Sequence, residues 1–366
     1  MDVIRETESI GAAFIGGGFM AEVHSRAARA ARADLVAGAS STPDSGRRAA
    51  ASLGLERAYD TLADLVADDS VDIVHVCTPN TTHAGIALAA LDAGKHVICE
   101  KPLATSTVDA ERLVARAAEQ GLVGTVPFVY RYHPMVRDAR ARVARGELGR
   151  LLSLSGSYLQ DWLLSAGDDD WRVDSATGGP SRAFADIGSH LCDLVEFVTG
   201  DRIRRLASVT RTVFRERAQN RDITTEDVAA LVVQTEAGAI GTLLVSQLAP
   251  GRKNRLSFEL SGTDSSVAFD QENPESLWLG RREGSGLVLR DPATLAPDAA
   301  RISNVPAGHP MGYQDAFNAF VADSYALARG EQREGVPTFA DGLRAVRLTE
   351  AVLASAASGE WIEVTA

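Results

Sequence analysis

Hydrophobic residues follow two different rhythms along the chain, and the change between them falls near residue 130. In the first third, short and nearly uninterrupted apolar runs alternate with alanine-rich stretches. Such runs are typical of parallel strands buried on both faces, and the stretches between them are typical of the helices that cover the sheet. The pattern predicts βαβ units, with strands at 10–15, 34–39, 71–77, 96–99 and 123–129 and helices at 82–93 and from 105 or 106 to just before 121.

Beyond residue 130 the predicted strands follow one another with few helices between them. They lie at 151–158, 203–214, 228–235, 240–247, 256–261 and 267–270. The links at 236–238 and 262–264 combine glycine with acidic residues and are typical of hairpins between antiparallel neighbours. Two helices, at 312–329 and 339–358, close the chain and must pack on one of the two sheets.

Length, charge and cysteine content exclude several classes of protein. The chain has 366 residues, which is more than the roughly 250–300 at which one core stops growing, so two domains are expected. The net charge of -12 repels nucleic acids and anionic membrane surfaces, so neither is an expected partner. Cys77 and Cys99 lie in apolar runs, and no Cys-x-x-Cys spacing occurs, which favours a reducing compartment. Residues 1–8 lack the pattern of a secretory signal, so a cytoplasmic location is expected.

A glycine-rich turn follows the first predicted strand. It reads Gly16-Gly17-Gly18-Phe19-Met20-Ala21 and leads into a helical pattern. Gly16 permits a tight turn, Gly18 lets the backbone approach a pyrophosphate, and Ala21 allows close packing of helix on strand. The N-terminus of the following helix supplies N–H groups and a positive dipole to the phosphates. The turn therefore predicts a dinucleotide site.

The second predicted strand ends at Ser40 and Ser41, where an acidic residue would hold the adenosine ribose hydroxyls. No carboxylate stands there to repel the 2′-phosphate of NADP, and both hydroxyls can still bond the ribose of NAD. Arg47 and Arg48 could contact a phosphate, but they lie in a helical stretch where a solvated cationic face is usual. NAD is the expected cofactor, and NADP is not excluded.

The fourth predicted strand ends in Glu100-Lys101-Pro102, at the edge of the sheet where ligands bind in open α/β folds. A lone Glu-Lys pair is usually a surface ion pair. Pro102, however, disfavours helix for Lys101, so the amine is expected to reach across the crevice. A lysine beside a cofactor can exchange protons with a substrate hydroxyl.

Asp186 and His190 are four residues apart, so they share one face of a helix, and Asp193 lies a further turn along that face. A carboxylate that holds one imidazole nitrogen fixes the tautomer and leaves the other nitrogen free to take a proton. A single histidine on a helix is more often structural. The same face could instead bind a divalent metal, but no second ligand cluster is evident, so no metal is expected.

Four segments occur in the order and approximate spacing of one known family. They are 16–21, Cys77-Thr78-Pro79-Asn80-Thr81-Thr82-His83, Gly94-Lys95-His96-Val97-Ile98-Cys99-Glu100-Lys101-Pro102 and Asp186-Ile187-Gly188-Ser189-His190-Leu191-Cys192-Asp193. With them the chain resembles the Gfo/Idh/MocA family of NAD(P)-dependent sugar and cyclitol oxidoreductases. The resemblance implies an α/β fold: an N-terminal doubly wound Rossmann domain at 1–128, and a C-terminal domain at 129–366 with a large, mainly antiparallel sheet that binds substrate and forms homo-oligomers.

The resemblance also implies roles for single residues. Lys101, Asp186 and His190 take the catalytic positions, and Pro79, Asn80, His83 and Glu100 lie near the nicotinamide. Many family members carry an acid where Ser40 stands, and Tyr130-Arg131-Tyr132 resembles the corresponding family segment only loosely. The expected cofactor site comprises Gly16, Gly18, Phe19, Met20, Ser40, Ser41, Thr78, Pro79, Asn80, His83, Glu100 and Lys101.

The segment 158–164, followed by Asp170-Trp171-Arg172, resembles a subgroup that acts on glucosides, anhydrosugars and related compounds. Trp162 and Trp171 would offer apolar rings to the C–H faces of a sugar, and Asp161 and Arg172 would bond its hydroxyls. Core packing and a surface ion pair are the alternative interpretation. The expected substrate site comprises Lys101, Tyr158, Asp161, Trp162, Trp171, Arg172, Asp186, His190, His309 and Tyr313.

The leading hypothesis is an oxidoreductase that moves a hydride from a secondary hydroxyl of a sugar, glycoside or cyclitol to a nicotinamide cofactor. His190 would accept the hydroxyl proton and Lys101 would stabilise the alkoxide-like charge, or the two roles would be reversed. One alternative is an NAD-dependent glycosidase that oxidises the sugar, eliminates the aglycone and returns the hydride. Another is a non-catalytic NAD-binding protein, which the presence of both Lys101 and His190 disfavours.

Overall fold

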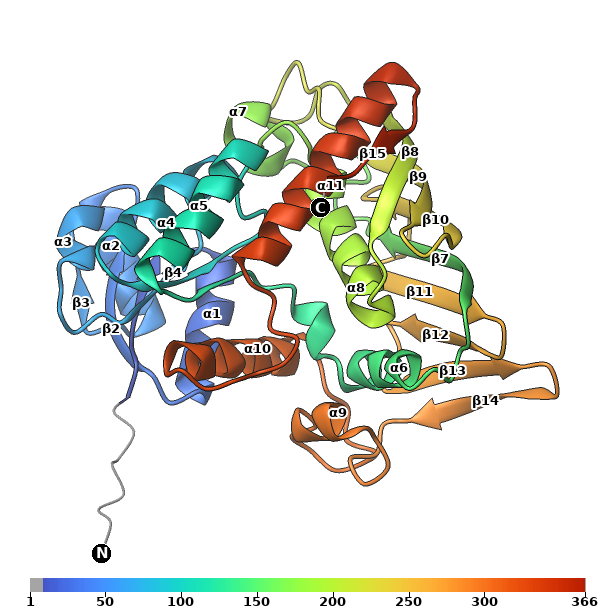
Figure 1. Ribbon diagram of the computed structural model, residues 1–366. Coiled ribbons are helices and arrows are strands. Elements are labelled where there is room, and N and C mark those ends of the chain that lie inside the picture. The colour runs from blue at the N-terminus through green and yellow to red at the C-terminus, as the bar shows by residue number, and fades with distance from the viewer. Residues whose placement is uncertain (1–8, 366) are drawn as a thin grey trace, which may run out of the picture.

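The computed structural model describes residues 9–365 and contains two β-sheets, with helix α11 (Phe339–Ser358) between them (Figure 1). The N-terminal third forms the smaller sheet and the helices between its strands, and the larger sheet lies on the other side of α11. Residues 1–8 fall outside the described residues, so the structure says nothing about the expected absence of a signal there.

The first sheet is parallel and has six strands in the order β3-β2-β1-β4-β5-β6. Its central strands are buried on both faces, as their uninterrupted apolar sequences require. This order is that of a doubly wound dinucleotide-binding fold. The strands are β1 (Gly11–Ile15), β2 (Asp34–Ala39), β3 (Arg57–Ala58), β4 (Ile73–Val76), β5 (His96–Cys99) and β6 (Gly124–Thr125).

Helices cover both faces of this sheet, and polar residues mark their beginnings. The Ser106 hydroxyl accepts a hydrogen bond from the Asp109 N–H at the start of α5, which confirms Ser106 as its N-cap. Gly121, in the left-handed region at φ +65°, ends the same helix. The helices are α1 (Phe19–Ala30), α2 (Pro43–Leu53), α3 (Leu62–Val66), α4 (His83–Asp92) and α5 (Thr107–Gln120), with a short 3₁₀ turn, η1 (Asn80–Thr82), before α4.

The strand predicted at 123–129 is wrong for most of its length. Only β6 pairs with the sheet, and the chain then turns into a 3₁₀ helix, η2 (Val129–Tyr132). The apolar residues of this segment are buried against helices instead, which is why their sequence resembles a strand. Pro127 has no N–H to donate to a neighbouring strand, and it lies between the two elements. The two-residue strand β3 has no apolar run and was not predicted.

The second sheet has nine strands in the order β14-β13-β12-β11-β7-β10-β9-β8-β15. All neighbours are antiparallel except β7 and β10, so the prediction of a large, mainly antiparallel sheet is confirmed. The strand predicted at 203–214 ends earlier, at Arg211. The strands are β7 (Leu151–Leu159), β8 (Ile203–Arg211), β9 (Val228–Thr235), β10 (Ile240–Ser246), β11 (Arg255–Gly262), β12 (Ser266–Asp270), β13 (Ser276–Arg281), β14 (Gly284–Leu289) and β15 (Ile362–Glu363).

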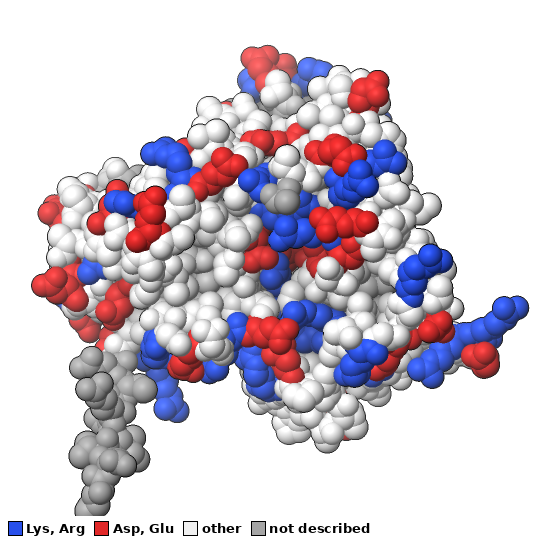
Figure 2. All heavy atoms as spheres, viewed as in Figure 1, with Lys and Arg blue, Asp and Glu red and all other residues white. Residues whose placement is uncertain are grey.

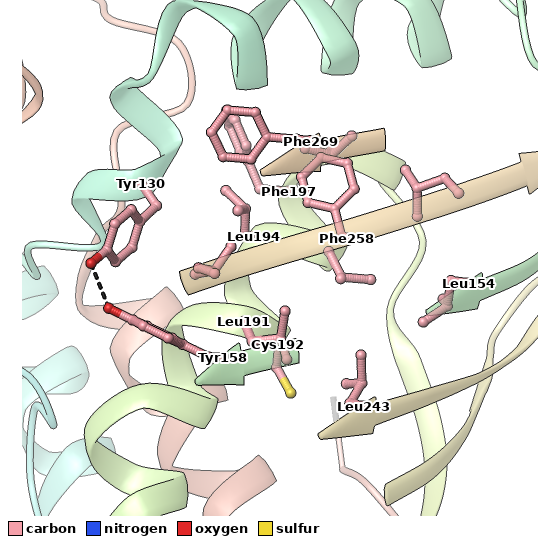
Figure 3. Packing of buried hydrophobic residues seen from close by; sticks show 14 of the residues in the cluster. Tyr130, Leu154, Tyr158, Leu191, Cys192, Leu194, Phe197, Leu243, Phe258 and Phe269 are labelled. Carbon is pink, nitrogen blue, oxygen red and sulfur yellow. Dashed lines mark hydrogen bonds between the residues drawn. The ribbon is translucent and has the colours of Figure 1, made fainter. Parts of the chain in front are cut away.

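Within residues 9–365, helices cover only one face of this second sheet. Strand β9 alternates buried Leu231 and Val233 with exposed Val232, as a sheet with one open face requires. Figure 3 shows aromatic and aliphatic side chains of the covered face packing against those of α8. The helical elements of this half are α6 (Pro134–Ala144), the 3₁₀ turn η3 (Trp171–Val173), α7 (Ser175–Gly178), the π-helical turn η4 (Phe184–Gly188), α8 (Ser189–Thr199) and α9 (Pro297–Arg301).

The last two helices return to the first sheet. Helix α10 (Tyr313–Ala328) lies beside α1 (Figure 1), where Phe317, Phe320 and Tyr325 join the core formed by Phe14 and its neighbours. Helix α11 packs on α5 and on β8, so it touches both sheets. The bounds of both helices agree with the predicted ranges to within one residue.

Acidic and basic side chains are interspersed over the face seen in Figure 2. Within residues 9–365, no helix has the length and apolar character needed to cross a membrane.

Candidate functional site

A cavity of about 460 Å³ opens where the carboxyl ends of the parallel strands face the second domain. The start of α1 and the end of β5 form one wall. Helix α8, strand β7 and the segment before β11 form the other. The lining residues are Phe19, Met20, Glu100, Lys101, Pro127, Tyr130, Tyr158, Gln160, Trp162, Arg172, Asp186, Ile187, His190, Asn254 and Tyr313.

The glycine turn at the end of β1 has the shape that a pyrophosphate requires. Gly16 has φ +107°, and a Cβ built there would lie 2.3 Å from the Cys77 carbonyl oxygen, so only glycine fits. A Cβ on Gly18 would meet no atom within 4 Å, so the space above it is open. Gly18 also precedes α1 without giving it a side-chain cap, which leaves the first N–H groups of the helix available. The turn fits the phosphates of a dinucleotide.

The other predicted cofactor residues lie along the same edge of the sheet. Ser40 and Ser41 directly follow β2. Beyond β4, the Asn80 amide donates to the Gly178 carbonyl at 2.8 Å and so ties this edge to the second domain. Pro79 is exposed. The His83 ring is fully buried between two carbonyl oxygens, with Nε2 2.8 Å from that of Thr78 and Nδ1 2.7 Å from that of Pro102. His83 therefore holds the two loops together and does not face the cavity.

Lys101 crosses from the end of β5 to the second domain, as its sequence context predicts. Its ammonium donates to Asp186 at 2.5 Å from Oδ1 and 3.0 Å from the backbone oxygen. Gln247 donates to the other carboxylate oxygen at 2.8 Å, and Arg172 lies 3.8 Å from Oδ1. Burial opposes ionisation of Asp186, but the charges of Lys101 and Arg172 lower its pKa to about 2. The carboxylate is ionised at neutral pH.

The predicted hydrogen bond between Asp186 and His190 is wrong. The Asp186 oxygens are taken by Lys101 and Gln247, and His190 Nδ1 has no hydrogen-bond partner within residues 9–365. The stronger partner, an ammonium from the other domain, occupies the carboxylate. Burial and the charge of Lys101 lower the pKa of His190 to about 3, so the imidazole is neutral at neutral pH. The rings of Phe128 and Tyr130 hold it edge-on, at 5.5 and 5.1 Å between centroids.

Asp193 does not share the face of Asp186 and His190. Its carboxylate binds the guanidinium of Arg131, which also contacts Asp341 at 2.8 Å. Asp186 lies in the π-helical turn before α8, so spacing counted from it along a regular α-helix fails. His190 and Asp193 both lie in α8, three residues apart, and Asp193 is held by Arg131. In residues 9–365, no three His, Cys, Asp or Glu side chains are grouped as a metal site would need.

The substrate-side wall is organised by a ring of hydrogen bonds that includes residues missed from the sequence. Tyr158 donates to Asn254 Oδ1 at 2.8 Å, and the Asn254 amide donates to the Tyr130 hydroxyl at 3.0 Å. The hydroxyls of Tyr130 and Tyr158 point toward one another and complete the ring (Figure 3). Gln160 donates to Asn254 and accepts from the Trp162 indole, each at 2.8 Å. No local signal marks Asn254 or Gln160, because they meet only in the folded chain.

Three predicted substrate residues lie away from the cavity. Asp161 accepts from Lys253 at 2.8 Å and from the Gly251 N–H at 3.0 Å. The Arg172 guanidinium carbon lies over the Trp171 ring, 4.3 Å from the ring centroid. His309 is exposed, and the cavity lining does not include it. None of these three residues lines the cavity, and two of them contact neighbouring side chains or backbone groups, so their role in substrate binding stays a prediction. Tyr158, Trp162, Arg172 and Tyr313 do line it.

A buried arginine holds the loop that carries Trp162. The Arg217 guanidinium donates to the carbonyls of Leu163, Ser165 and Asp168 at 2.8–3.1 Å. Asp227, fully buried, accepts from Arg217 at 2.8 Å and also binds Arg182. These bonds satisfy the backbone of an irregular loop and fix its position against the second sheet.

Comparisons with known proteins agree with this geometry. The sequence profile of the oxidoreductase family with an NAD-binding Rossmann fold matches residues 10–128, and that of the GFO/IDH/MocA C-terminal domain matches 136–268. Levoglucosan dehydrogenase of Pseudarthrobacter phenanthrenivorans is 29% identical, with 98% of each chain covered.

Two solved structures are similar over nearly the whole chain. An oxidoreductase domain protein from Kribbella flavida is 34% identical with a TM-score of 0.90, covering 98% of this chain and 100% of that one. An inositol dehydrogenase homologue from Azotobacter vinelandii, complexed with NAD⁺, is 30% identical with a TM-score of 0.88 and 98% coverage of each. With its NAD-binding Rossmann domain and its nine-stranded second sheet, the chain belongs to the GFO/IDH/MocA family of oxidoreductases.

Proposed function

We propose that the protein is an NAD-dependent dehydrogenase that oxidises a secondary hydroxyl of a sugar, anhydrosugar, glycoside or cyclitol. One observation carries the proposal: Lys101 from β5 and His190 from α8 line the same cavity as the start of α1. The similarity to levoglucosan dehydrogenase and to an inositol dehydrogenase homologue supports a substrate that carries several hydroxyls on a ring.

The cofactor residues have separable tasks in this proposal. Gly16, Gly18 and the N-terminus of α1 hold the pyrophosphate, Ser40 and Ser41 contact the adenosine ribose, and the 78–83 segment and Glu100 flank the other end. When bound, the nicotinamide supplies the acceptor for the hydride that leaves the carbinol carbon. NAD is favoured by the NAD⁺ complex of the similar structure, and the serines leave NADP open.

His190 and Lys101 act on the oxygen of the reacting hydroxyl. As the alcohol becomes a carbonyl it loses a proton from oxygen and a hydride from carbon. The His190 imidazole is neutral. Its Nδ1 is fully buried, so Nε2, which makes no hydrogen bond within residues 9–365, is the atom that accepts the proton. The Lys101 ammonium, held by Asp186, donates to the same oxygen and stabilises the negative charge that develops there.

The substrate-side wall recognises the rest of the molecule. Trp162 offers an apolar ring to the C–H face of a sugar, while Arg172, Tyr313 and the ring formed by Tyr130, Tyr158 and Asn254 offer polar groups to its hydroxyls. A site whose polar groups pair with substrate hydroxyls rejects analogues that lack them.

The deciding experiment incubates the protein with NAD⁺ and, separately, NADP⁺ against anhydrosugars, free sugars, cyclitols and aryl glycosides. Reduced nicotinamide and released aglycone are followed in parallel. The proposal predicts that reduced nicotinamide accumulates with at least one compound and that no aglycone is released. Aglycone release without net reduction would instead identify an NAD-dependent glycosidase. Binding of NAD⁺ without either product across the panel would favour a non-catalytic protein.

A homo-oligomer and a cytoplasmic location complete the proposal. The open face of the nine-stranded sheet exposes apolar side chains that a second copy could cover, among them Val209, Val232, Leu244, Trp278 and Leu287. Multi-angle light scattering should give a mass above the 38.8 kDa of one chain, and Val232→Lys should lower that mass.

Cys77, Cys99 and Cys192 are free thiols, which suits a reducing compartment such as the cytoplasm. Cell fractionation tests this location.

A further inference from the structure

Four polar side chains form a continuous buried chain that ends beside Lys101. The Tyr325 hydroxyl lies 2.8 Å from His75 Nε2, His75 Nδ1 lies 2.9 Å from His24 Nδ1, and His24 Nε2 lies 2.9 Å from Glu100 Oε1. Tyr325, His75 and His24 are fully buried, and Glu100 is 6% exposed. They come from α10, β4, α1 and the end of β5, so four separate elements contribute to one line of hydrogen bonds.

The carboxylate at one end fixes the direction of the bond from His24, and a neutral His24 ring fixes the directions of the other two. An ionised Glu100 can only accept, so His24 must donate from Nε2. In a neutral His24 ring the Nδ1 atom then accepts, so His75 must donate from Nδ1. His75 Nε2 accepts in turn from the Tyr325 hydroxyl. All three hydrogens therefore point toward Glu100, and only one tautomer of His24 and one of His75 allow all three hydrogen bonds.

Burial keeps His75 neutral, and the hydrogen bond from His24 helps to keep the glutamate charged. Burial, the largest cause, and the neighbouring His24 lower the pKa of His75 well below its ordinary value. Burial opposes the ionisation of Glu100, but the hydrogen bond from His24 and the charges of its neighbours lower its pKa. The titratable and charged groups around Glu100 are His24, Lys101, His83, Cys77, Cys99, His190, Arg172 and Tyr313.

Glu100 connects this chain to the cavity. Its Oε2 accepts from the Lys101 backbone N–H at 3.1 Å, and its side chain lines the cavity with Lys101 and His190. The negative charge of Glu100 also raises the proton affinity of His190, against the opposing effect of burial. The ionised state and position of Glu100 therefore bear on both groups of the proposed chemistry.

We propose that Tyr325, His75 and His24 form a relay that holds Glu100 ionised and fixed beside Lys101, so that they act as positioning residues. The inference rests on the proposed function for its kinetic consequence, but the relay itself exists without cofactor or substrate. Ordinary core packing does not require such a chain. The surrounding cluster is apolar, and burying three polar side chains there is costly unless every one is paired in a single direction.

The direct test is a spectrum of the cofactor-free protein labelled with ¹⁵N-histidine. The proposal predicts two neutral rings at neutral pH, His24 protonated at Nε2 and His75 at Nδ1, with a coupling across the bond between their Nδ1 atoms. His24→Asn and His75→Asn assign the two signals. Two rings in other tautomers, a doubly protonated His24, or no coupling between them would overturn the relay, whatever the enzyme does.

The kinetic test uses matched variants and the pH profile of kcat/KM with whichever panel compound is oxidised. An asparagine at 24 cannot reach Glu100, whereas the longer glutamine places an amide near the position of Nε2. In His24→Asn, Glu100 loses its hydrogen-bond donor, so we expect the pH below which kcat/KM falls to rise by about one unit. His24→Gln should bring this pH most of the way back. Tyr325→Phe should raise the same pH by a smaller amount.

Tyr132→Phe is the control, because Tyr132 is equally buried in the same cluster and takes no part in the relay. Its profile should match that of the unmodified protein. If His24→Asn does not fold, the nearly isosteric Tyr325→Phe and the spectrum decide. If the pH below which kcat/KM falls is unshifted in folded Tyr325→Phe and His24→Asn, the positioning role is overturned. A protein with the predicted tautomers and no dehydrogenase activity would contradict the proposed function instead and leave the relay standing.

Discussion

The two walls of the cavity differ in how their polar groups are paired. On the cofactor side, the start of α1 has no side-chain cap and the space above Gly18 is open. On the substrate side, Tyr130, Tyr158 and Asn254 satisfy one another in a closed ring. Unpaired N–H groups at a helix N-terminus are prepared for an anion, whereas a satisfied ring holds its shape without ligand. One wall is completed by the cofactor, and the other is preorganised.

Lys101 joins the two walls, so its loss should have the largest effect. Lys101→Met removes the donor to the reacting oxygen and leaves Asp186 without its ammonium. We expect kcat to fall by about 10³-fold, within the range of general acid–base and electrostatic contributions. Titration of NAD⁺ by fluorescence should still detect binding. Lys95→Met, at the other end of β5, is the control and should retain activity.

Alanine substitutions at two glycines of the first wall should have different effects, one on NAD⁺ binding and the other on stability. In Gly18→Ala the added methyl enters open space, so stability should be unchanged, but we expect NAD⁺ to bind at least about tenfold more weakly because the methyl occupies the approach of the pyrophosphate. In Gly16→Ala the methyl meets the Cys77 carbonyl oxygen, and the backbone is left-handed. That variant should instead unfold at lower urea concentration. Equal affinity for NAD⁺ in Gly18→Ala and the parent would contradict the placement of the phosphates.

Asn254→Leu tests whether the second wall is independent of the first. It removes the acceptor of the Tyr158 hydroxyl and of the Gln160 amide, and the donor to the Tyr130 hydroxyl. We expect kcat/KM for the substrate to fall about tenfold, because unpaired buried groups cost about 1–3 kcal/mol. The affinity for NAD⁺ should not change. A matching loss in NAD⁺ affinity would show that the walls are coupled.

The pH profile of the unmodified protein should show the smallest effect. The pKa of His190 is lowered to about 3, so the imidazole stays neutral as the pH falls through the usual histidine range. We expect kcat/KM to change by no more than about twofold between pH 8 and pH 5, with the loss below that range. Circular dichroism over the same range controls for unfolding. A loss of activity centred near pH 6.5 would contradict the buried, neutral imidazole.

The sequence predicts the first wall better than the second for a physical reason. Gly16 and Gly18 follow β1, and Glu100 and Lys101 follow β5. Both strands belong to one parallel sheet, and parallel topology brings their carboxyl ends to one edge. Asn254 and Tyr130 are 124 residues apart, so their contact depends on how β7 and β11 pair and where η2 turns. A local pattern contains no signal of that kind.

Helical spacing also fails where the helix is irregular or where a distant charge competes. The prediction that Asp186 holds His190 counts residues along a regular helix, but Asp186 itself lies in the π-helical turn and Lys101 binds its carboxylate. Asp161 and Trp171 also do not line the cavity, since the Asp161 carboxylate binds Lys253 and the Trp171 ring packs against the Arg172 guanidinium. Residue type and spacing predict the chemistry available to a loop, and only its packing decides which side chains face the cavity.

The transfer of deuterium tests the central claim most directly. A panel compound that is oxidised is prepared with deuterium at its carbinol carbons and incubated with NAD⁺, and the mass of the reduced cofactor is measured. The account predicts a reduced cofactor that carries one deuterium, at a rate slower than with the unlabelled compound. Reduced cofactor without deuterium, or no reduced cofactor with any compound, would contradict it.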